Sequence, residues 1–269
     1  MPKFRTTILG LLLLAISSTT WARLDPDKPT VFITGSNRGI GFEFVEQYAA
    51  RGWNVVATTR TPAKADQLQA LAAASENIVI EQLDVTDFDR IDALAAKYAE
   101  QTIDILINNA GLTPKYMSAF KRVSGVDWDI ARESMEVNAI APLKLAQAFM
   151  DVVAASDQKK IIVISSKGGS FEIGPKMPMM YSYRASKTAV NMYMYTLSFE
   201  TPKKGVIVTL LSPGQVNTMS DTEQFKGIKM PDTIETDESV SKMLKVIDGL
   251  TPDDNGKFLD YEDGAELPW

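Results

Sequence analysis

Tyr183 and Lys187 stand four residues apart in a segment whose pattern predicts a helix, so their side chains share one helical face. A free phenol has a pKa near 10 and is a poor acid–base catalyst at neutral pH, but a neighbouring ammonium stabilises the phenolate. A tenfold gain in acidity requires about 1.4 kcal/mol, which a nearby cation can supply. The pair is therefore a candidate proton donor, although the same spacing also occurs in ordinary helices.

The chain contains neither histidine nor cysteine. These absences exclude a Ser-His-Asp triad, a thiol nucleophile and a zinc site of the ordinary ligand type, so acid–base chemistry must rely on Tyr, Lys, Asp or Glu. The lack of cysteine leaves the redox compartment open. A net charge of -6 argues against nucleic-acid binding, which needs clustered Lys and Arg.

A glycine-rich turn follows the first predicted strand and leads directly into a helical pattern. Glycines let the backbone turn sharply and approach a pyrophosphate, whose charge then lies against the N–H groups at the start of the helix. Such a motif is sometimes only a tight turn, but its place after the first strand favours a dinucleotide site. The residues of this predicted cradle are Gly35, Ser36, Asn37, Arg38, Gly39, Ile40 and Gly41.

Two arginines indicate which dinucleotide would bind. At the end of the second strand an acidic residue binds a ribose 2′-hydroxyl and a basic one binds its phosphate. The chain has Thr58-Thr59-Arg60 there, with no Asp or Glu, and Arg38 is expected near the same ribose. We therefore expect NADP(H) to be favoured over NAD(H). The alternative is that both arginines are solvated surface side chains.

Short β-rich runs alternate with longer helical stretches, which predicts one α/β domain of the doubly wound Rossmann type over residues 30–269, with a mostly parallel sheet. The expected strands, about seven, are Val31–Thr34, Asn54–Thr58, Ile78–Leu83, Ile103–Ile107, Ile161–Ile164, Val206–Leu211 and Phe258–Leu259. The expected helices are Gly39–Arg51, Ala63–Ala74, Phe88–Glu100, Trp128–Ala154, Tyr181–Glu200 and Asp237–Leu250. Asp87 is placed to cap the third helix.

The amino terminus differs in character from the rest of the chain. Lys3 and Arg5 precede an apolar run, Ile8 to Ile16, that is too short to span a bilayer, and Ala22 is a small residue suited to a cleavage point. We expect residues 1–22 to be a signal peptide of an exported or periplasmic protein, with no stable membrane insertion after cleavage. The alternatives are an uncleaved anchor or an incidental apolar tail, which would leave the protein membrane-tethered or cytoplasmic.

The glycine spacing G-x-x-x-G-x-G resembles that of short-chain dehydrogenases/reductases, and the chain from Thr30 to its end follows that family's pattern. Two serines after the buried strand Ile161–Ile164, followed by the Tyr183 and Lys187 pair, add to the likeness. The closing segment Leu259–Gly264 and the terminal Leu-Pro-Trp resemble the carbonyl-reductase-like branch, which includes C-factor and Sniffer-type proteins. The resemblance implies an NADPH-dependent enzyme that reduces an aldehyde or ketone to an alcohol.

The resemblance also implies further cofactor contacts. Asp84 would contact the adenine ring, and the segment after the fourth strand would lie on the adenosine side, with plain turn chemistry as the alternative for its two asparagines. The loop after the sixth strand would contact the nicotinamide carboxamide, or would be a simple turn. Tyr183 and Lys187 would touch the cofactor as well. The additional residues are Asp84, Val85, Asn108, Asn109, Ala110, Gly111, Pro213, Gly214, Val216 and Thr218.

The implied reaction transfers hydride to a carbonyl carbon while Tyr183 delivers a proton to the carbonyl oxygen. Ser166 would polarise that oxygen, with Ser165 as the weaker candidate, and Lys187 would hold the nicotinamide ribose and lower the pKa of the tyrosine. Asn138 would anchor a water that links the lysine to solvent, or would simply be a polar residue that kinks its helix. No metal is implied.

Two segments are expected to shape the substrate site. The loop between Ser166 and Tyr183 is longer than is common in the family, and its Met-rich part, Phe171–Met180, would wall an adaptable pocket or lie on the surface. A flap is expected around 219–236. The partner is then a small carbonyl compound, and a homo-oligomer remains open. The alternative function is a nucleotide-binding signalling protein of the same fold with little or no turnover.

Overall fold

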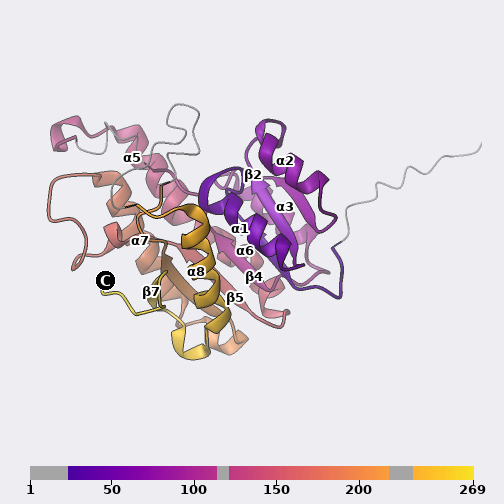
Figure 1. Ribbon diagram of the computed structural model, residues 1–269. Helices are drawn as coiled ribbons and strands as arrows, with labels where there is room; N and C mark the ends of the chain where they lie inside the picture. Colours follow the sequence, from indigo (N-terminus) through magenta and orange to yellow (C-terminus); the bar gives the residue numbers. More distant parts are fainter. Residues whose placement is uncertain (1–23, 114–120, 218–232) are drawn as a thin grey trace, which may run out of the picture.

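Seven parallel strands form one sheet in the order β3-β2-β1-β4-β5-β6-β7 (Figure 1). The computed structural model describes residues 24–113, 121–217 and 233–269. The strands are β1 (Thr30–Ile33), β2 (Asn54–Thr59), β3 (Ile78–Gln82), β4 (Ile105–Asn108), β5 (Lys160–Ile164), β6 (Ile207–Ser212) and β7 (Phe258–Asp260). The expected doubly wound Rossmann-type fold is confirmed, and each strand lies within two residues of its predicted bounds.

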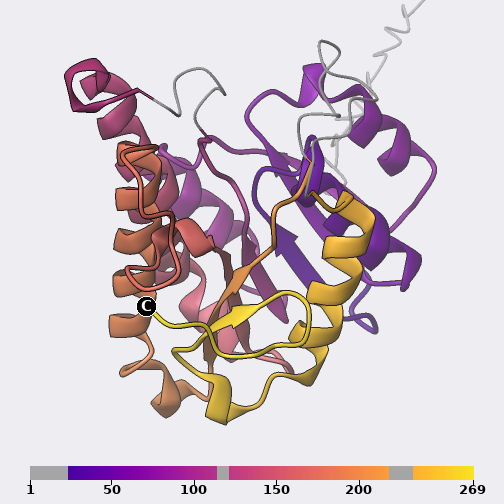
Figure 2. The same cartoon turned by 60° about the vertical axis from the view of Figure 1, so that its left-hand side comes forward.

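Helices cover both faces of the sheet (Figure 2). The helices are α1 (Gly39–Ala50), α2 (Asp66–Ala73), α3 (Phe88–Lys97), α5 (Trp128–Met135), α6 (Ala141–Ala154), α7 (Tyr181–Leu197) and α8 (Thr236–Gly249). Side chains of α1, α2 and α8 share one buried cluster, and those of α3, α6 and α7 share the other. Successive strand residues alternate between the two clusters, as Val31 and Phe32 do, because neighbouring side chains on a strand point to opposite faces. This double burial explains why the strands are continuous apolar runs.

Strand order reverses direction between β1 and β4. β1 pairs with β2 on one side and with β4 on the other, and the helices of the two crossover connections, α1 and α3, lie on opposite faces of the sheet. Such a switch point opens a crevice outside the carboxyl ends of the strands, where ligands bind in open α/β sheets. The glycine turn after β1 and the segment after β4 both end at this crevice.

The predicted helix Trp128–Ala154 is continuous but not uniform. A π-helical segment, η3 (Glu136–Ile140), joins α5 to α6. Pro142 follows at once and has no N–H to donate to the carbonyl of Asn138, which interrupts the regular ladder. Although this helix is long and apolar enough to span a membrane, half of its apolar window is buried in the protein, as in a core helix.

Helix ends account for the other differences from prediction. Asp87 caps α3 as expected, because its carboxylate accepts a hydrogen bond from Arg90 N at 3.0 Å. The helix predicted over 63–74 is instead a short 3-10 turn, η1 (Pro62–Lys64), followed by α2. The predicted signal peptide (1–22) lies outside the described residues, as does most of the predicted flap (219–236).

Candidate active site

A cavity of about 450 Å³ runs along the crevice between β1 and β4. Its walls combine the glycine turn, the ends of β2 and β4, the segment after β3, the end of β5 and the start of α7. Tyr183 and Lys187 line the same cavity as the glycine turn, so residues far apart in the chain meet here. The predicted residues that line it are Gly35, Asn37, Arg38, Gly39, Ile40, Gly41, Arg60, Asp84, Val85, Asn109, Ala110, Gly111, Ser165, Tyr183, Lys187 and Pro213.

The glycine turn has the geometry of a phosphate cradle. Gly35 and Gly39 have φ of 69° and 58°, in the left-handed region that glycine adopts without strain. A Cβ on Gly41 would lie 2.2 Å from the carbonyl oxygen of Gly35, so only glycine lets α1 pack so closely on the turn. No side chain caps the first turn of α1, and that turn contains no acidic residue. Its backbone N–H groups and the positive end of the helix dipole suit an anionic pyrophosphate.

Three predicted residues support the cradle from beneath, and two of them, Ser36 and Asn108, do not line the cavity. The Asn109 amide donates to the carbonyl oxygens of Thr34 and Gly35 at 2.9 and 3.1 Å, which ties the segment after β4 to the glycine turn. The Ser36 hydroxyl is fully buried and donates to Ile33 O at 3.0 Å. Asn108 is 2% exposed, and neither side-chain atom has a hydrogen-bond partner in the part of the chain that the structure describes.

Unpaired cations surround the outer end of the cavity. Arg38, Arg60 and Lys64 are exposed and line its wall, and none of their charged groups has an ion pair or hydrogen bond among the described residues. Arg51, by contrast, pairs with Asp248 at 2.9 Å. Three free cations around one cavity suit a phosphate. Lys64 was missed in the sequence, although its place four residues after Arg60 was a usable signal.

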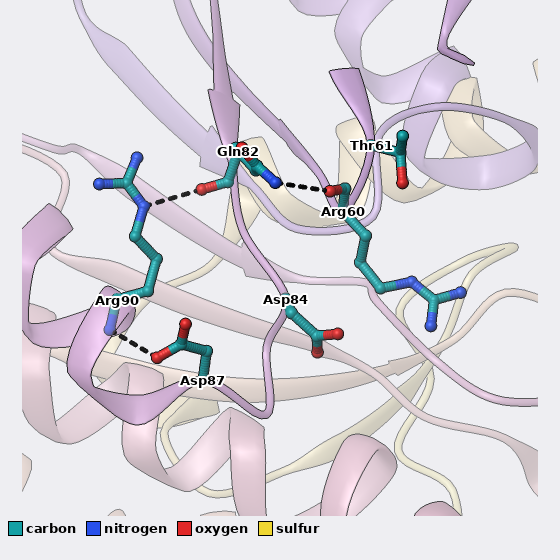
Figure 3. A pocket seen from close by; sticks show the side chains of 6 residues that line it. All are labelled: Arg60, Thr61, Gln82, Asp84, Asp87 and Arg90. Carbon is teal, nitrogen blue, oxygen red and sulfur yellow. Dashed lines mark hydrogen bonds between the residues drawn. The ribbon is translucent and has the colours of Figure 1, made fainter. Parts of the chain in front are cut away.

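A second cavity, of about 630 Å³, adjoins this end and shares Arg60, Thr61 and Asp84 with the first (Figure 3). The side chains of Arg60 and Asp84 extend to the same side, whereas the Arg90 guanidinium turns to the other side of Gln82. Arg90 Nε donates to Gln82 O at 2.9 Å. Arg90 is therefore held by the protein, and Arg60 is the guanidinium of this cavity that remains available to a ligand.

The start of α7 and the end of β5 bring the predicted catalytic residues together. Lys187 Nζ lies 5.8 Å from the centroid of the Tyr183 ring and donates to Ile164 O at 2.8 Å. Ser166 follows β5 as the N-cap of the 3-10 turn η4 (Lys167–Gly169), and its Oγ accepts from Gly168 N at 3.0 Å. Its hydroxyl lies close enough to the Tyr183 phenol to lower the pKa of that phenol.

Ser165 and Ser166 have different surroundings. Ser165 is 2% exposed, and its hydroxyl donates to Asn191 Oδ1 at 2.5 Å. Ser166 is half-buried and sits beside Tyr183: a Cβ on Gly168 would lie 3.2 Å from Ser166 Oγ and 3.9 Å from Tyr183 Cε1. The Ser166 hydroxyl is therefore the one of the pair that can reach a molecule at the phenol.

Burial dominates the protonation of both central groups. It raises the pKa of the half-buried Tyr183 phenol above its usual value, and the hydrogen bond from Ser166 opposes that change. Burial likewise lowers the pKa of Lys187 from 10.5 to about 8. The sequence led us to expect an ammonium that lowers the pKa of the phenol. That expectation also counted the charge of a bound oxidised nicotinamide; among the protein's own groups, burial outweighs the neighbouring groups and raises the pKa of the phenol.

Asn138 joins the catalytic helix to the segment after β4. It is 1% exposed; its Oδ1 accepts from Leu112 N at 2.6 Å, and its Nδ2 donates to Leu112 O and to Ser186 Oγ at 3.0 and 2.9 Å. A Cβ on Gly111 would lie 3.4 Å from Asn138 Oδ1 and 3.9 Å from Lys187 Nζ. Asn138 therefore lies next to the inner side of Lys187, and it is held by the π-helical segment.

The loop after β6 closes the inner end of the cavity. Pro213 lines the wall, and Gly214 has a φ of 80° beside the Tyr261 ring. Val216 pairs with Ile234 in an isolated parallel bridge, which holds the described end of the predicted flap against this loop. Thr218 lies outside the described residues.

The Met-rich segment Phe171–Met180 does not line the cavity. Phe171, Ile173 and Met177 are exposed, so the surface-loop interpretation describes this segment better than a pocket wall does. Arg184 donates to Gly168 O and Met177 O, and Glu172 N donates to Trp269 O at 3.2 Å. The segment therefore lies beside α7 and the carboxyl-terminal residues (Figure 2).

Comparison with known proteins agrees with this geometry. Residues 29–229 match the family model for short chain dehydrogenase. An uncharacterized oxidoreductase of Schizosaccharomyces pombe is 32% identical over 252 residues, which cover 88% of this chain and 97% of the relative. The NADPH-bound carbonyl reductase from chicken fatty liver superposes with a TM-score of 0.79 at 33% identity, covering 90% of this chain and 99% of its own. Carbonyl reductase Sniffer of Drosophila melanogaster gives 0.78 at 28% identity, covering 90% and 100%.

Proposed function

The chain belongs to the short-chain dehydrogenase family and is an oxidoreductase of that family, and we propose that it uses NADPH to reduce an aldehyde or ketone to the corresponding alcohol. The observation that carries the proposal is one cavity whose wall includes an uncapped helix start, three unpaired cations, and the Tyr183 and Lys187 pair. A protein that only bound a nucleotide would have no physical need for that pair beside the Ser166 hydroxyl.

The residues of the cavity fit NADPH from end to end. The N–H groups at the start of α1 would hold the pyrophosphate, and Arg38, Arg60 and Lys64 would hold the 2′-phosphate. Asp84 and Val85 would lie at the adenine, and Lys187 would hold the nicotinamide ribose. The NADPH named for the chicken carbonyl reductase supports the same choice of cofactor. When bound, the dihydronicotinamide supplies the hydride.

Side chains of the protein would supply the proton that the reduction requires. Tyr183 holds a proton at neutral pH, because burial keeps the pKa of its phenol above the ordinary value, and it would donate that proton to the carbonyl oxygen. Ser166, which lies beside the same phenol, would donate a hydrogen bond to that oxygen as negative charge develops on it. Lys187, beside the ring, would stabilise the resulting phenolate, and Asn138 lies next to Lys187, where proton exchange with solvent would begin.

The test of this function is consumption of NADPH by the purified chain with a panel of aldehydes and ketones, followed by absorbance, with NADH as the comparison cofactor. We expect turnover with NADPH and much less with NADH at equal concentration. Tight NADPH binding with no turnover across the panel would instead favour the signalling alternative.

We also propose that residues 1–22 direct the chain out of the cytoplasm and are then removed, leaving a mature chain that contains the domain of residues 30–269. Amino-terminal sequencing of exported protein tests this proposal. Cleavage after Ala22 would make Arg23 the first residue of the mature chain. Recovery of the intact chain from the membrane or the cytoplasm would overturn it.

A further inference from the structure

Three side chains of α7 meet the end of β5 at intervals of one helical turn. Tyr183, Lys187 and Asn191 recur every four residues, so they share one face of the helix. Lys187 Nζ donates to Ile164 O at 2.8 Å, and Asn191 Oδ1 accepts from the hydroxyl of the next residue, Ser165, at 2.5 Å. Two consecutive residues of the strand end are thus held by two consecutive turns of the catalytic helix.

The Ser165 and Asn191 pair is buried and polar. Ser165 is 2% exposed and Asn191 is 3% exposed. Asn191 Nδ2 has no hydrogen-bond partner among the described residues. An unpartnered buried donor costs free energy, and a pair of apolar side chains at positions 165 and 191 would avoid that cost. Stability alone therefore does not explain an asparagine at this position.

The pair lies one residue away from the proposed catalytic serine. Ser166 continues directly from Ser165 into the turn η4, and that turn approaches α7 closely: a Cβ on Gly169 would lie 2.9 Å from the Lys187 carbonyl carbon. The distance between the Ser166 hydroxyl and the Tyr183 phenol therefore depends on how the strand end is seated on α7. Asn191 and Lys187 hold the strand end itself, while Thr188 and Arg184 hold the following turn through hydrogen bonds to Gly169 O at 2.7 Å and Gly168 O at 3.2 Å.

We propose that Asn191 is a positioning residue for the reaction, acting through the Ser165 hydroxyl to hold Ser166 in register with Tyr183. The inference rests on the proposed reductase function. In this proposal Ser165 does not bind the substrate but links Asn191 to Ser166. Asn191 affects the reaction without touching the substrate. Lys187 contributes the second tie, but it is also placed at the cofactor, so Asn191 is the residue where positioning can be tested separately.

The test compares Asn191→Leu, Ser165→Ala and the double variant with the wild type, measuring kcat, KM for NADPH and thermal stability. Leucine matches the size of asparagine but accepts no hydrogen bond. Each single variant is expected to lower kcat about tenfold or more, since small misplacements of reacting groups are costly. The double variant is expected to be no slower than the single ones, because the two side chains act as one unit. KM for NADPH should stay unchanged, and the double variant, which leaves neither buried group without a partner, should be at least as stable as the wild type.

Met192→Leu is the matched control, because Met192 is the next residue of α7 and is 62% exposed. It should keep the wild-type kcat. If the wild type is active and the Asn191→Leu variant keeps the wild-type kcat, the inference is overturned and the proposed function is unaffected. A kcat loss that simply follows a loss of thermal stability would overturn it too, as would additive effects in the double variant. A wild type that reduces no carbonyl compound would overturn the proposed function, and the inference with it.

Discussion

Lys187 Nζ lies 5.8 Å from the centroid of the Tyr183 ring and, on its other side, donates to the carbonyl oxygen of Ile164 at 2.8 Å. The lysine is 6% exposed, so its charge is held in a largely desolvated place. Burial lowers its pKa to about 8, which means that the folded protein bears a cost for keeping it protonated at neutral pH. That cost is a measurable sign that the residue serves function rather than stability.

Lys187→Met is expected to raise the free energy of unfolding at neutral pH. A pKa lowered from 10.5 to about 8 corresponds to a cost on the order of 3 kcal/mol. Loss of the hydrogen bond from the Lys187 ammonium to Ile164 O offsets about 1.5–3 kcal/mol of the gain. We therefore expect a net gain of up to about 1.5 kcal/mol by denaturant unfolding of the protein without cofactor, together with a loss of activity.

The increase in the free energy of unfolding that Lys187→Met produces must depend on pH. Between about 8 and 10.5 the unfolded chain keeps the Lys187 proton and the folded chain releases it, so wild-type stability rises with pH through this range. The difference between the variant and the wild type should be greatest below about pH 8 and should shrink towards pH 10.5. Two results would contradict the claim that burial lowers the pKa of Lys187. One is a variant that is less stable than the wild type at neutral pH, and the other is a stability difference that does not change with pH.

Arg60→Ala is expected to weaken NADPH binding about 10- to 100-fold, because a hydrogen bond to a charged phosphate contributes about 1.5–3 kcal/mol. NADH binding should change little, since NADH lacks the 2′-phosphate. Fluorescence titration of both nucleotides measures the two affinities. The matched control is Arg132→Ala, which removes an exposed arginine that pairs with Asp129 and does not line the cavity. Equal losses of affinity for NADPH and NADH would contradict the role assigned to Arg60.

Gly41→Ala is expected to destabilise the fold by about 2 kcal/mol or more, because overpacking of this kind typically costs 1–3 kcal/mol. The added Cβ would lie 2.2 Å from Gly35 O and 2.4 Å from Asn109 Nδ2, so the cradle itself must move and NADPH binding should fall. Gly249→Ala is the control, because nothing lies within 4 Å of its added Cβ at the end of α8. Thermal unfolding of the two variants checks the contrast.

The fold could be predicted because its signals are local. Each strand is a continuous apolar run between turn residues, and the glycine turn follows β1, which pairs with β4 at the switch point of the sheet. Helix ends were harder to place. The 3-10 turn at Pro62–Lys64 and the π-helical segment at Glu136–Ile140 depend on prolines and on tertiary packing, which periodicity does not reveal.

The site was harder to predict than the fold, because side-chain partners come from distant segments. Two adjacent serines look alike in the sequence, yet only the structure shows that the Ser165 hydroxyl is bound to Asn191. Lys64 joins Arg38 and Arg60 through the path of the turn after β2. The direction of the Tyr183 pKa depends on burial, which outweighs the cation that the spacing suggested.

The catalytic role of Tyr183 is the central claim, and Tyr183→Phe tests it most directly. The change removes one hydroxyl and keeps the ring beside Lys187. The measurement is kcat for NADPH-dependent carbonyl reduction, made beside an NADPH titration of the same preparation. We expect kcat to fall about 100-fold or more, the usual range for loss of a general acid, while NADPH affinity stays near that of the wild type. Turnover at the wild-type rate, with NADPH bound as before, would contradict the account.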